Sequence, residues 1–329
     1  MMNGNTAKFG KRHFFTAAIT ILIFSVCHLL AASFFQDVLK SPFFFDTIFM
    51  TAALFLFGPL AENFVKIPAA SIKGTESWTP SSDVFVSGRK LEIASFYMSD
   101  HEVTRGEYKA VMESDPSTAE AYDKDGNELT GDDNVKNNPV NNISWYDALV
   151  YCNTRSMKEG LTPCYSIDGK ADPSEWGSVP TSNNSTWNAA TCDFTADGYR
   201  LPTEIEWEWA ARGGESYTYA GSDDIDEVAW YKGNWVSYLY GGTRDVMSKK
   251  ANGYGLYDMS GNVWEWCWDW YENISSDTPS SRSAGPKRCR RGGSWCIMFA
   301  DDALVASRRY DDPDYGYDDS GFRLVRNAN

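Results

Sequence analysis

Two long apolar runs dominate the first 63 residues of the chain. The first spans residues 14–35 and follows three cations, and the second spans residues 43–60; the cations are Lys8, Lys11 and Arg12. A cationic start before an apolar stretch is typical of a secretory signal or signal anchor, and about 20 apolar residues cross a bilayer. We therefore expect residues 1–63 to be a membrane-targeting segment that exports or anchors the chain. Cys27 stands in a loose lipoprotein box, and the alternative is a soluble protein with a mis-assigned start.

Beyond residue 63 the pattern of apolar and polar positions changes to that of a globular domain. Residues 65–68 and 90–97 read as short strands. Thr104, with Glu107 three residues later, is a capping-box start for a helix over residues 105–112. Two further helices are predicted to begin at Ser144 and Thr203 and to end near Ser156 and Arg212, the last of these followed by Gly213-Gly214.

The rest of the chain carries little helical periodicity. Residues 168–190 are rich in Gly, Pro, Ser and Asn, which indicates a surface hairpin or insertion. Residues 215–329 read as loops and short strands with many Gly and Trp side chains. A few helices within a loop-rich, aromatic β framework predict an α+β domain over residues 64–329.

Composition and charge restrict the classes of function and of metal site that the chain can have. The chain has 13 Trp, 18 Tyr and 18 Phe, enough for a sizeable core, and a net charge of −15. Nucleic-acid binding is excluded because a phosphate backbone requires a Lys/Arg surface. Seven cysteines without a CxxC, together with three histidines, argue against a zinc site. Cys164 and Cys192 flank the polar insertion and are candidates for a disulfide; buried, inert thiols are the alternative.

Several strings along the domain identify a family resemblance. In chain order they are Phe96-Tyr97, Glu102-Val103-Thr104, Pro139-Val140, Ile143-Ser144-Trp145-Tyr146-Asp147-Ala148, Gly198-Tyr199-Arg200-Leu201-Pro202-Thr203-Glu204, Glu206-Trp207-Glu208, Gly255-Leu256-Tyr257-Asp258-Met259-Ser260-Gly261-Asn262-Val263-Trp264-Glu265-Trp266, Arg291-Gly292-Gly293-Ser294-Trp295 and Gly321-Phe322-Arg323. Together they resemble the formylglycine-generating enzyme (sulfatase-modifying factor) family over residues 64–326. The resemblance implies a C-type lectin-like α+β fold with little regular secondary structure.

Conspicuous charges within these strings are interpreted as structural. Buried charges are tolerated when they are paired and hydrogen-bonded, so we expect loops to be locked by Arg200, Glu204, Glu206 and Arg323. A catalytic carboxylate pair is the alternative. The resemblance also implies a structural calcium at Asp258, Gly261, Val263 and Glu265, since carboxylates and carbonyls are suitable ligands. A turn without metal is the alternative, and no cofactor is required.

The chain lacks the pair of cysteines that the enzymes of the resembling family use for catalysis. The family's oxidases use two cysteines five residues apart, shortly after the Gly-Gly-Ser-aromatic string, to bind copper and attack the substrate. Here Cys296 stands at or beside the first position, and an aspartate occupies the second. The related sulfoxide synthases need a domain with three iron-binding histidines, which residues 1–63 do not encode. We therefore expect no catalysis; a formylglycine-generating oxidoreductase acting on exported sulfatases is the alternative.

The segment of residues 296–320 has an unusual composition. Its seven Asp and two Arg give a local charge of −5, and it holds three Tyr but no Trp, Lys, Glu or Gln. Except for Met298, every residue can be encoded by a codon ending in C, the spectrum expected from AAC codons diversified at their adenines. This resembles the variable region of proteins diversified by retroelements. Fixed-looking residues 305–308 and Pro313 recur inside it. An ordinary acidic loop is the alternative.

Segment 296–320 is therefore the predicted recognition surface of a surface-displayed receptor or adhesin. Rigid tyrosines with adaptable polar neighbours suit binding. The predicted contact residues are Cys296, Ile297, Phe299, Asp302, Arg309, Tyr310, Asp311, Asp312, Tyr315, Tyr317, Asp318 and Asp319. The expected partner is a protein or other macromolecular ligand, and a structural envelope protein is a further alternative.

Overall fold

The computed structural model describes residues 63–234, 241–279 and 284–328. The chain divides into two units, residues 1–62 and 63–329, and the second unit contains all the described residues. The predicted targeting segment, residues 1–63, lies outside the described residues except for Asn63. Within the described ranges, no helix has the length and apolarity needed to span a membrane.

The described elements are short. The strands are β1 (Phe64–Ile67), β2 (Ala70–Ile72), β3 (Leu91–Ile93), β4 (Phe96–Ser99), β5 (Ala121–Tyr122), β6 (Glu128–Leu129), β7 (Tyr165–Ser166), β8 (Thr191–Cys192), β9 (Thr243–Arg244), β10 (Trp264–Trp270), β11 (Arg288–Arg291), β12 (Arg309–Asp311), β13 (Ser320–Gly321) and β14 (Val325–Asn327). The helices are α3 (Arg105–Met112), α4 (Asp132–Val135), α5 (Trp145–Lys158), α6 (Ser185–Asn188), α7 (Glu204–Arg212) and α8 (Ile225–Val228), with 3-10 turns η1 (Pro173–Glu175), η2 (Lys232–Asn234) and η3 (Ala300–Ala303). The mixture confirms the predicted α+β class.

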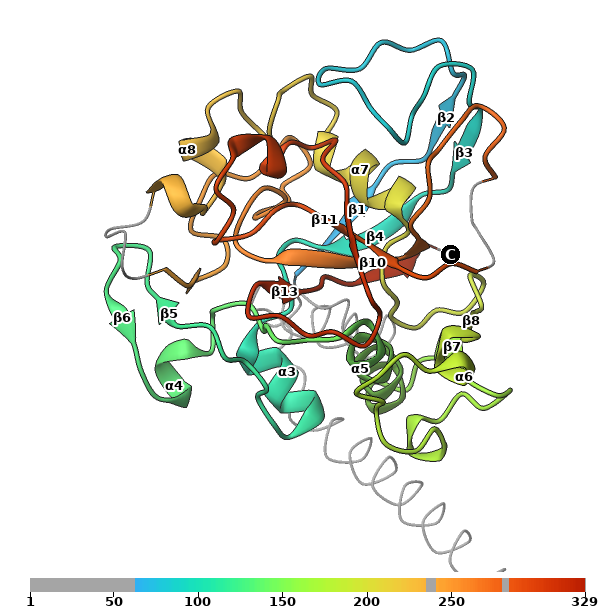
Figure 1. Ribbon diagram of the computed structural model, residues 1–329, viewed down its shortest axis with the longest axis vertical. Helices are drawn as coiled ribbons and strands as arrows, with labels where there is room; N and C mark the ends of the chain where they lie inside the picture. Colours follow the sequence, from blue (N-terminus) through green and yellow to red (C-terminus); the bar gives the residue numbers. More distant parts are fainter. Residues whose placement is uncertain (1–62, 235–240, 280–283, 329) are drawn as a thin grey trace, which may run out of the picture. The chain divides into compact units, whose positions relative to one another are not determined.

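A four-stranded sheet of order β12-β11-β10-β13 holds both ends of the later part of segment 296–320. Strand β12 pairs antiparallel with β11, and β13 pairs parallel with β10. In Figure 1, α7 lies on one side of this sheet and α3 and α5 lie on the other. Because the sheet fixes β12 and β13, it determines where the loop between them stands.

The helix starts follow from local hydrogen bonding, as predicted. Thr104, Ser144 and Thr203 each form a capping box with the carboxylate three residues later. Helix α7 ends at Gly213, whose φ of 60° is left-handed. Helix α5 continues two residues beyond the predicted end at Ser156.

Two predictions about the strands and the polar insertion need correction. Residues 90–97 form two strands, since the chain leaves its pairing with β2 after Ile93 and enters a different sheet, β1-β4-β14, at Phe96. Residues 168–190 are not merely a surface hairpin. Pairing of β7 with β8 closes the insertion, and Trp176 and Trp187 inside it pack edge to face and are buried.

Tryptophans fill the core and also satisfy their own polar groups. The indole N–H of Trp145 donates to the Cys267 carbonyl, and that of Trp266 donates to the Ile143 carbonyl, at 3.1 and 2.8 Å. A buried indole with a partner adds apolar area without an unsatisfied donor. These two bonds tie α5 and the residues before it to the central strand β10.

The described cysteines are free thiols. Cys164 and Cys192 lie on the neighbouring strands β7 and β8, where Cys192 pairs with Tyr165, but they form no disulfide. Burial raises the pKa of both thiols, to about 11 for Cys164. The structure thus shows the inert-thiol alternative.

Candidate functional site

Segment 296–320 presents most of its large rings to solvent. The exposed fractions of Phe299, Tyr310, Tyr315 and Tyr317 are 68%, 48%, 49% and 41%. Tyr315 and Tyr317 pack together with ring centroids 5.8 Å apart. Exposed rings that pack against neighbours lose little conformational freedom on contact with a partner, which suits recognition.

The twelve predicted contact residues divide by exposure. The exposed ones are Phe299, Arg309, Tyr310, Tyr315, Tyr317 and Asp318. The half-buried ones are Cys296, Asp302, Asp311, Asp312 and Asp319. One prediction needs correction: Ile297 is 6% exposed and packs in an apolar cluster with Tyr219 and Trp264. A turn closed by the Ile297 amide, which donates to the Ser294 carbonyl at 3.3 Å, brings this side chain back beside Gly293.

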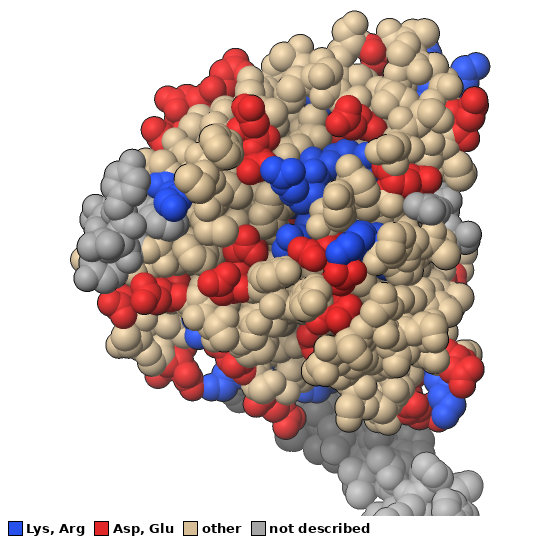
Figure 2. Space-filling model, viewed as in Figure 1, with Lys and Arg blue, Asp and Glu red and all other residues tan. Residues whose placement is uncertain are grey.

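The carboxylates of the segment are largely paired with cations. Asp302 pairs with Arg309, Asp311 with Arg290 at 2.8 Å, and Asp312 with Lys287 at 2.5 Å; Arg290 and Lys287 come from outside the segment. Figure 2 shows Lys and Arg gathered near the centre of this face with Asp and Glu beside them. Arg290 and Lys287 therefore offset two of the five net negative charges of the segment.

Cys296 lies beside a carboxylate rather than a second thiol. Its Sγ is 3.1 Å from Asp319 Oδ2 and 3.5 Å from Ser294 Oγ. Burial, reinforced by the Asp319 charge, raises the pKa of the Cys296 thiol to about 12. A thiol that stays protonated at neutral pH is a poor nucleophile and a poor soft-metal ligand.

Sequence reasoning missed three contributors to this surface. Met298 is 69% exposed beside Phe299 but is not among the predicted contact residues. Tyr271 packs against Tyr310 with ring centroids 4.3 Å apart and an interplanar angle of 42°. Lys287 reaches Asp312 from the residue before β11. Tyr271 and Lys287 are distant from the segment in sequence, and the pairing of β10 with β11 and of β11 with β12 brings them to it.

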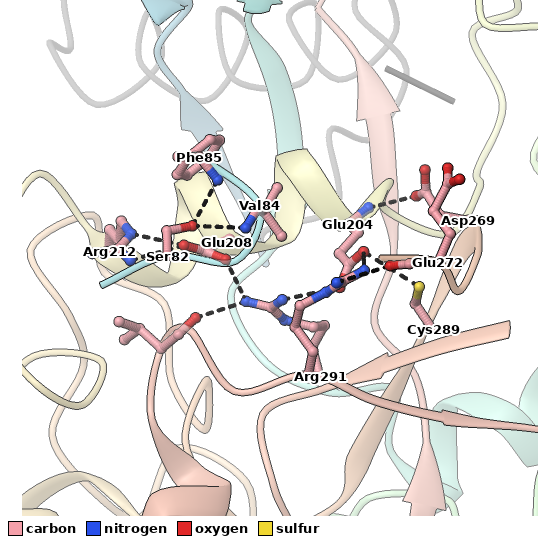
Figure 3. A network of polar contacts seen from close by, with 12 residues as sticks. Ser82, Val84, Phe85, Glu204, Glu208, Arg212, Asp269, Glu272, Cys289 and Arg291 are labelled. Atoms are coloured by element: carbon pink, nitrogen blue, oxygen red, sulfur yellow. Dashed lines mark hydrogen bonds and ion pairs between the residues drawn. The ribbon is translucent and has the colours of Figure 1, made fainter. Parts of the chain in front are cut away.

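A buried polar network anchors the middle of the segment from below (Figure 3). Arg291 donates to Glu204 at 3.0 Å and to Glu208 at 2.7 Å, joining β11 to α7. Arg308 adds a forked pair to Glu204, with distances of 2.6 and 2.8 Å. Buried charges paired in this way confirm the structural role predicted for Glu204, and they assign Arg308 to the framework rather than to the surface.

The pKa values of two carboxyl groups in this network are shifted in opposite directions. Burial alone would raise the pKa of Glu204, but the hydrogen bonds and charges of Arg308 and Arg291 lower it to about 2. Asp269, which accepts the Glu204 backbone N–H at 2.6 Å, has its pKa raised to about 7 by burial and by the Glu204 charge.

The two carboxylates implied as calcium ligands have protein partners in the structure. Both Glu265 oxygens accept from Arg323, at 2.6 and 2.7 Å, and one also accepts from the Trp207 indole. Asp258 Oδ2 accepts from the Met247 backbone N–H, while Oδ1 has no partner, and burial raises the Asp258 pKa to about 6. A guanidinium thus occupies the place of a metal beside Glu265. Among the described residues, no three His, Cys, Asp or Glu side chains are grouped to hold a metal ion.

Known proteins similar to this chain include a formylglycine-generating enzyme and a variable protein of known structure. The chain is 35% identical over 257 residues to "Chaperone protein LppX" of Paenibacillus barcinonensis, covering 73% of this chain and 83% of that protein. It is 34% identical over 165 residues to the formylglycine-generating enzyme of Streptomyces coelicolor, a match that spans 44% of this chain and 51% of the enzyme. Among solved structures, Treponema denticola variable protein 1 superposes with a TM-score of 0.68 at 32% identity, over 80% of this chain and 94% of that one.

The match to a whole family is broader than any of these pairs. Residues 60–328 match the family described as "Sulfatase-modifying factor enzyme 1-like domain", which is nearly the entire second unit of the chain. The sequence strings, the α+β fold and the relatives agree with this match. The chain therefore belongs to the sulfatase-modifying factor enzyme 1-like family.

Proposed function

We propose that the chain is a non-catalytic, exported ligand-binding protein whose recognition surface is segment 296–320. The observation that carries the proposal is the exposure of Tyr310, Tyr315 and Tyr317 on a segment held from beneath by Arg290 and Arg308. Such rings stand ready to contact a partner while the framework remains unchanged. The likeness to a structure named a variable protein supports the same use of the fold.

The partner proposed for this surface is a protein or another macromolecular ligand. The rings are large and exposed, and Asp302, Asp311 and Asp312 of the same segment form ion pairs. Aromatic anchors together with polar pairs are typical of a protein-binding surface. Export and membrane association are part of the proposal, and they rest on the cationic and apolar pattern of residues 1–63.

The experiment uses the full-length chain in its own cells. A photo-reactive phenylalanine analogue replaces Tyr310, and in a matched variant it replaces Phe194, a 42%-exposed ring outside the segment. We expect a discrete adduct from position 310 and none from position 194. With the probe moved to Phe299, the added Tyr310, Tyr315 and Tyr317→Ala substitutions should reduce capture at least about tenfold, since aromatic anchors carry most of the binding energy of an interface.

Two outcomes would contradict the proposal. Equal capture from positions 310 and 194, or capture unaffected by the three alanines, would mean that segment 296–320 is not the binding surface. Copper-dependent conversion of a cysteine peptide that disappears in Cys296→Ser would instead favour the oxidase alternative, which the resemblance to formylglycine-generating enzymes keeps open.

A further inference from the structure

Arg290 contacts both halves of the recognition segment at once. The side chain projects from β11 and its residue is 8% exposed. Nη2 pairs with Asp311 of β12 at 2.8 Å, and Nη1 donates to the Ser320 hydroxyl of β13. The Asp319 carboxylate lies 3.9 Å from Nη1.

The same guanidinium also lies among rings. Its centre is 5.4 Å from the Trp266 ring centroid, 5.9 Å from that of Trp264 and 5.5 Å from that of Tyr317. The two tryptophans belong to the framework strand β10, whereas Tyr317 belongs to the segment and is exposed. Arg290 therefore connects framework rings to a ring offered for recognition.

A guanidinium in this position depends on both of its carboxylate neighbours. A mostly buried cation is stable only while its charge and donors are matched. Asp311 supplies the closest match, and Asp319 lies within reach but farther away. Loss of the Asp311 charge would therefore draw Arg290 toward Asp319, and Tyr317 lies against the side chain that moves.

We propose that Arg290 is a positioning residue that couples position 311 to the turn of residues 317–320, so that a change at Asp311 alters how Tyr317 is presented. The inference rests on the proposed function in treating Tyr317 as a contact residue. It means that positions of the recognition surface are not independent, and that exchange of Asp311 changes specificity beyond its own contacts.

The pair formed by Arg309 and Asp302 offers a contrast within the same segment. Arg309 is 54% exposed at its side chain, and its carboxylate partner lies seven residues away along the chain. An exposed pair of this kind is screened by water and is worth little. The coupling is therefore expected at Arg290 and not at each cation of the surface.

Backbone amides report the turn without any ligand. The Asn142 and Ser320 amides donate to the Tyr317 carbonyl at 2.7 and 3.0 Å, and the Trp264 amide donates to the Asp319 carbonyl at 2.8 Å. Hydrogen exchange at these three amides measures how often the turn opens.

The experiment compares Asp311→Asn, Arg290→Met and the double variant in the full-length chain. Asp311→Asn should speed exchange at the Asn142 and Ser320 amides about tenfold, as expected for loss of one charge-assisted hydrogen bond. In the Arg290→Met background, Asp311→Asn should have no further effect on these amides. Arg290→Lys, which keeps the charge without the fork, should restore part of the protection.

Arg105→Met is the matched control. Arg105 pairs with Asp115 at 2.7 Å with side-chain exposures of 15% and 16%, against 10% and 18% for Arg290 and Asp311. Its removal should leave exchange at residue 320 unchanged. Equal acceleration in Arg105→Met, or additive effects of the Arg290 and Asp311 substitutions, would overturn the inference. If Arg290→Met fails to fold, Asp311→Asn and Arg290→Lys still decide it.

The exchange readout separates this inference from the proposed function. If photo-capture at position 310 fails but the amides respond as expected, the coupling stands and the recognition role falls. If capture succeeds but the amides do not respond, the surface binds without the Arg290 coupling.

Discussion

Two adjacent arginines in segment 296–320 have opposite environments. The Arg308 side chain is 6% exposed and makes a forked pair with the buried Glu204, whereas the Arg309 side chain is 54% exposed and pairs with Asp302. The same residue type thus serves the framework at one position and the surface at the next. Burial decides the energetic difference, because solvent screens an exposed pair but cannot screen a carboxylate left unpaired inside the protein.

Replacement of each arginine by methionine tests this difference. Arg308→Met should lower the free energy of unfolding by about 3 kcal/mol, since it removes the fork from a buried carboxylate. Arg309→Met should lower it by less than about 1 kcal/mol. Urea unfolding of the two variants beside the unsubstituted protein measures both values. Similar losses for the two would contradict the assignment of Arg308 to the framework.

Single residues show how much of segment 296–320 can be predicted from the sequence. The tyrosines of segment 296–320 were predicted to face solvent from composition, and they do so. Ile297 was misassigned because composition does not reveal where the chain turns inward. Tyr271 and Lys287 were missed because their contacts with the segment depend on how β10, β11 and β12 pair, which local sequence does not encode.

Helix α7 begins with a local capping motif and carries the glutamates of the buried network beneath segment 296–320. Its N-cap Thr203 accepts from the Glu206 N–H, and the Glu206 carboxylate returns to the Thr203 N–H and also pairs with Arg200. Glu204, the residue after Thr203, forms ion pairs with Arg291 and Arg308. The cap therefore fixes the start of the helix that holds the buried network in place.

Loss of the α7 cap should weaken the domain measurably. Thr203→Ala removes the acceptor for the Glu206 N–H and should lower the free energy of unfolding by about 1 kcal/mol. For a domain of this size that corresponds to a Tm lower by about 2–4 °C. Scanning calorimetry measures it, with Thr75→Ala at an exposed position as the control, which should change Tm by less than about 1 °C. An unchanged Tm in Thr203→Ala would show that the cap is dispensable.

The helices were easier to predict than the strands for a physical reason. The capping box of α3 uses side chains three residues apart, so the sequence displays both partners together. Strand β13 instead pairs with β10 across more than fifty residues, and β3 and β4 separate into different sheets within one apolar run. Such pairings are chosen by tertiary packing, which composition and periodicity do not specify.

For the domain as a whole, two buried carboxyl groups make the free energy of unfolding depend on pH in opposite directions. The Glu204 pKa is lowered from 4.5 to about 2, so its stabilisation is present above pH 4.5 and is lost as the pH falls toward 2. The Asp269 pKa is raised from 3.8 to about 7, so its contribution favours the folded state at low pH and is lost as the pH rises to 7. In the folded domain Glu204 keeps its charge above pH 7, whereas Asp269 is about half ionised at pH 7 and is largely ionised by about pH 8.

Above pH 7 the largest single contribution to the pH dependence of stability is expected from His101. Its Nδ1 lies 2.5 Å from Asp100, and its Nε2 lies 3.4 Å from Glu107, near the start of α3. Burial alone would lower the His101 pKa, but hydrogen bonds to Asp100 and Glu107 raise it from 6.5 to about 9. The stabilisation from the imidazolium is therefore complete below pH 6.5 and is lost as the pH rises through 9.

The unfolding free energy should consequently fall by about 1 kcal/mol between pH 7 and pH 8, below the range in which the buried thiols ionise on unfolding, and His101→Gln should remove most of that fall. Asp100→Asn should retain the histidine but move the end of the decline below pH 9, because the imidazolium then keeps only Glu107 as its nearby hydrogen-bonded carboxylate. Urea unfolding at half-unit pH steps measures all three proteins. The same slope in His101→Gln as in the unsubstituted protein would mean that another group controls stability in this range, because the described domain holds no second histidine.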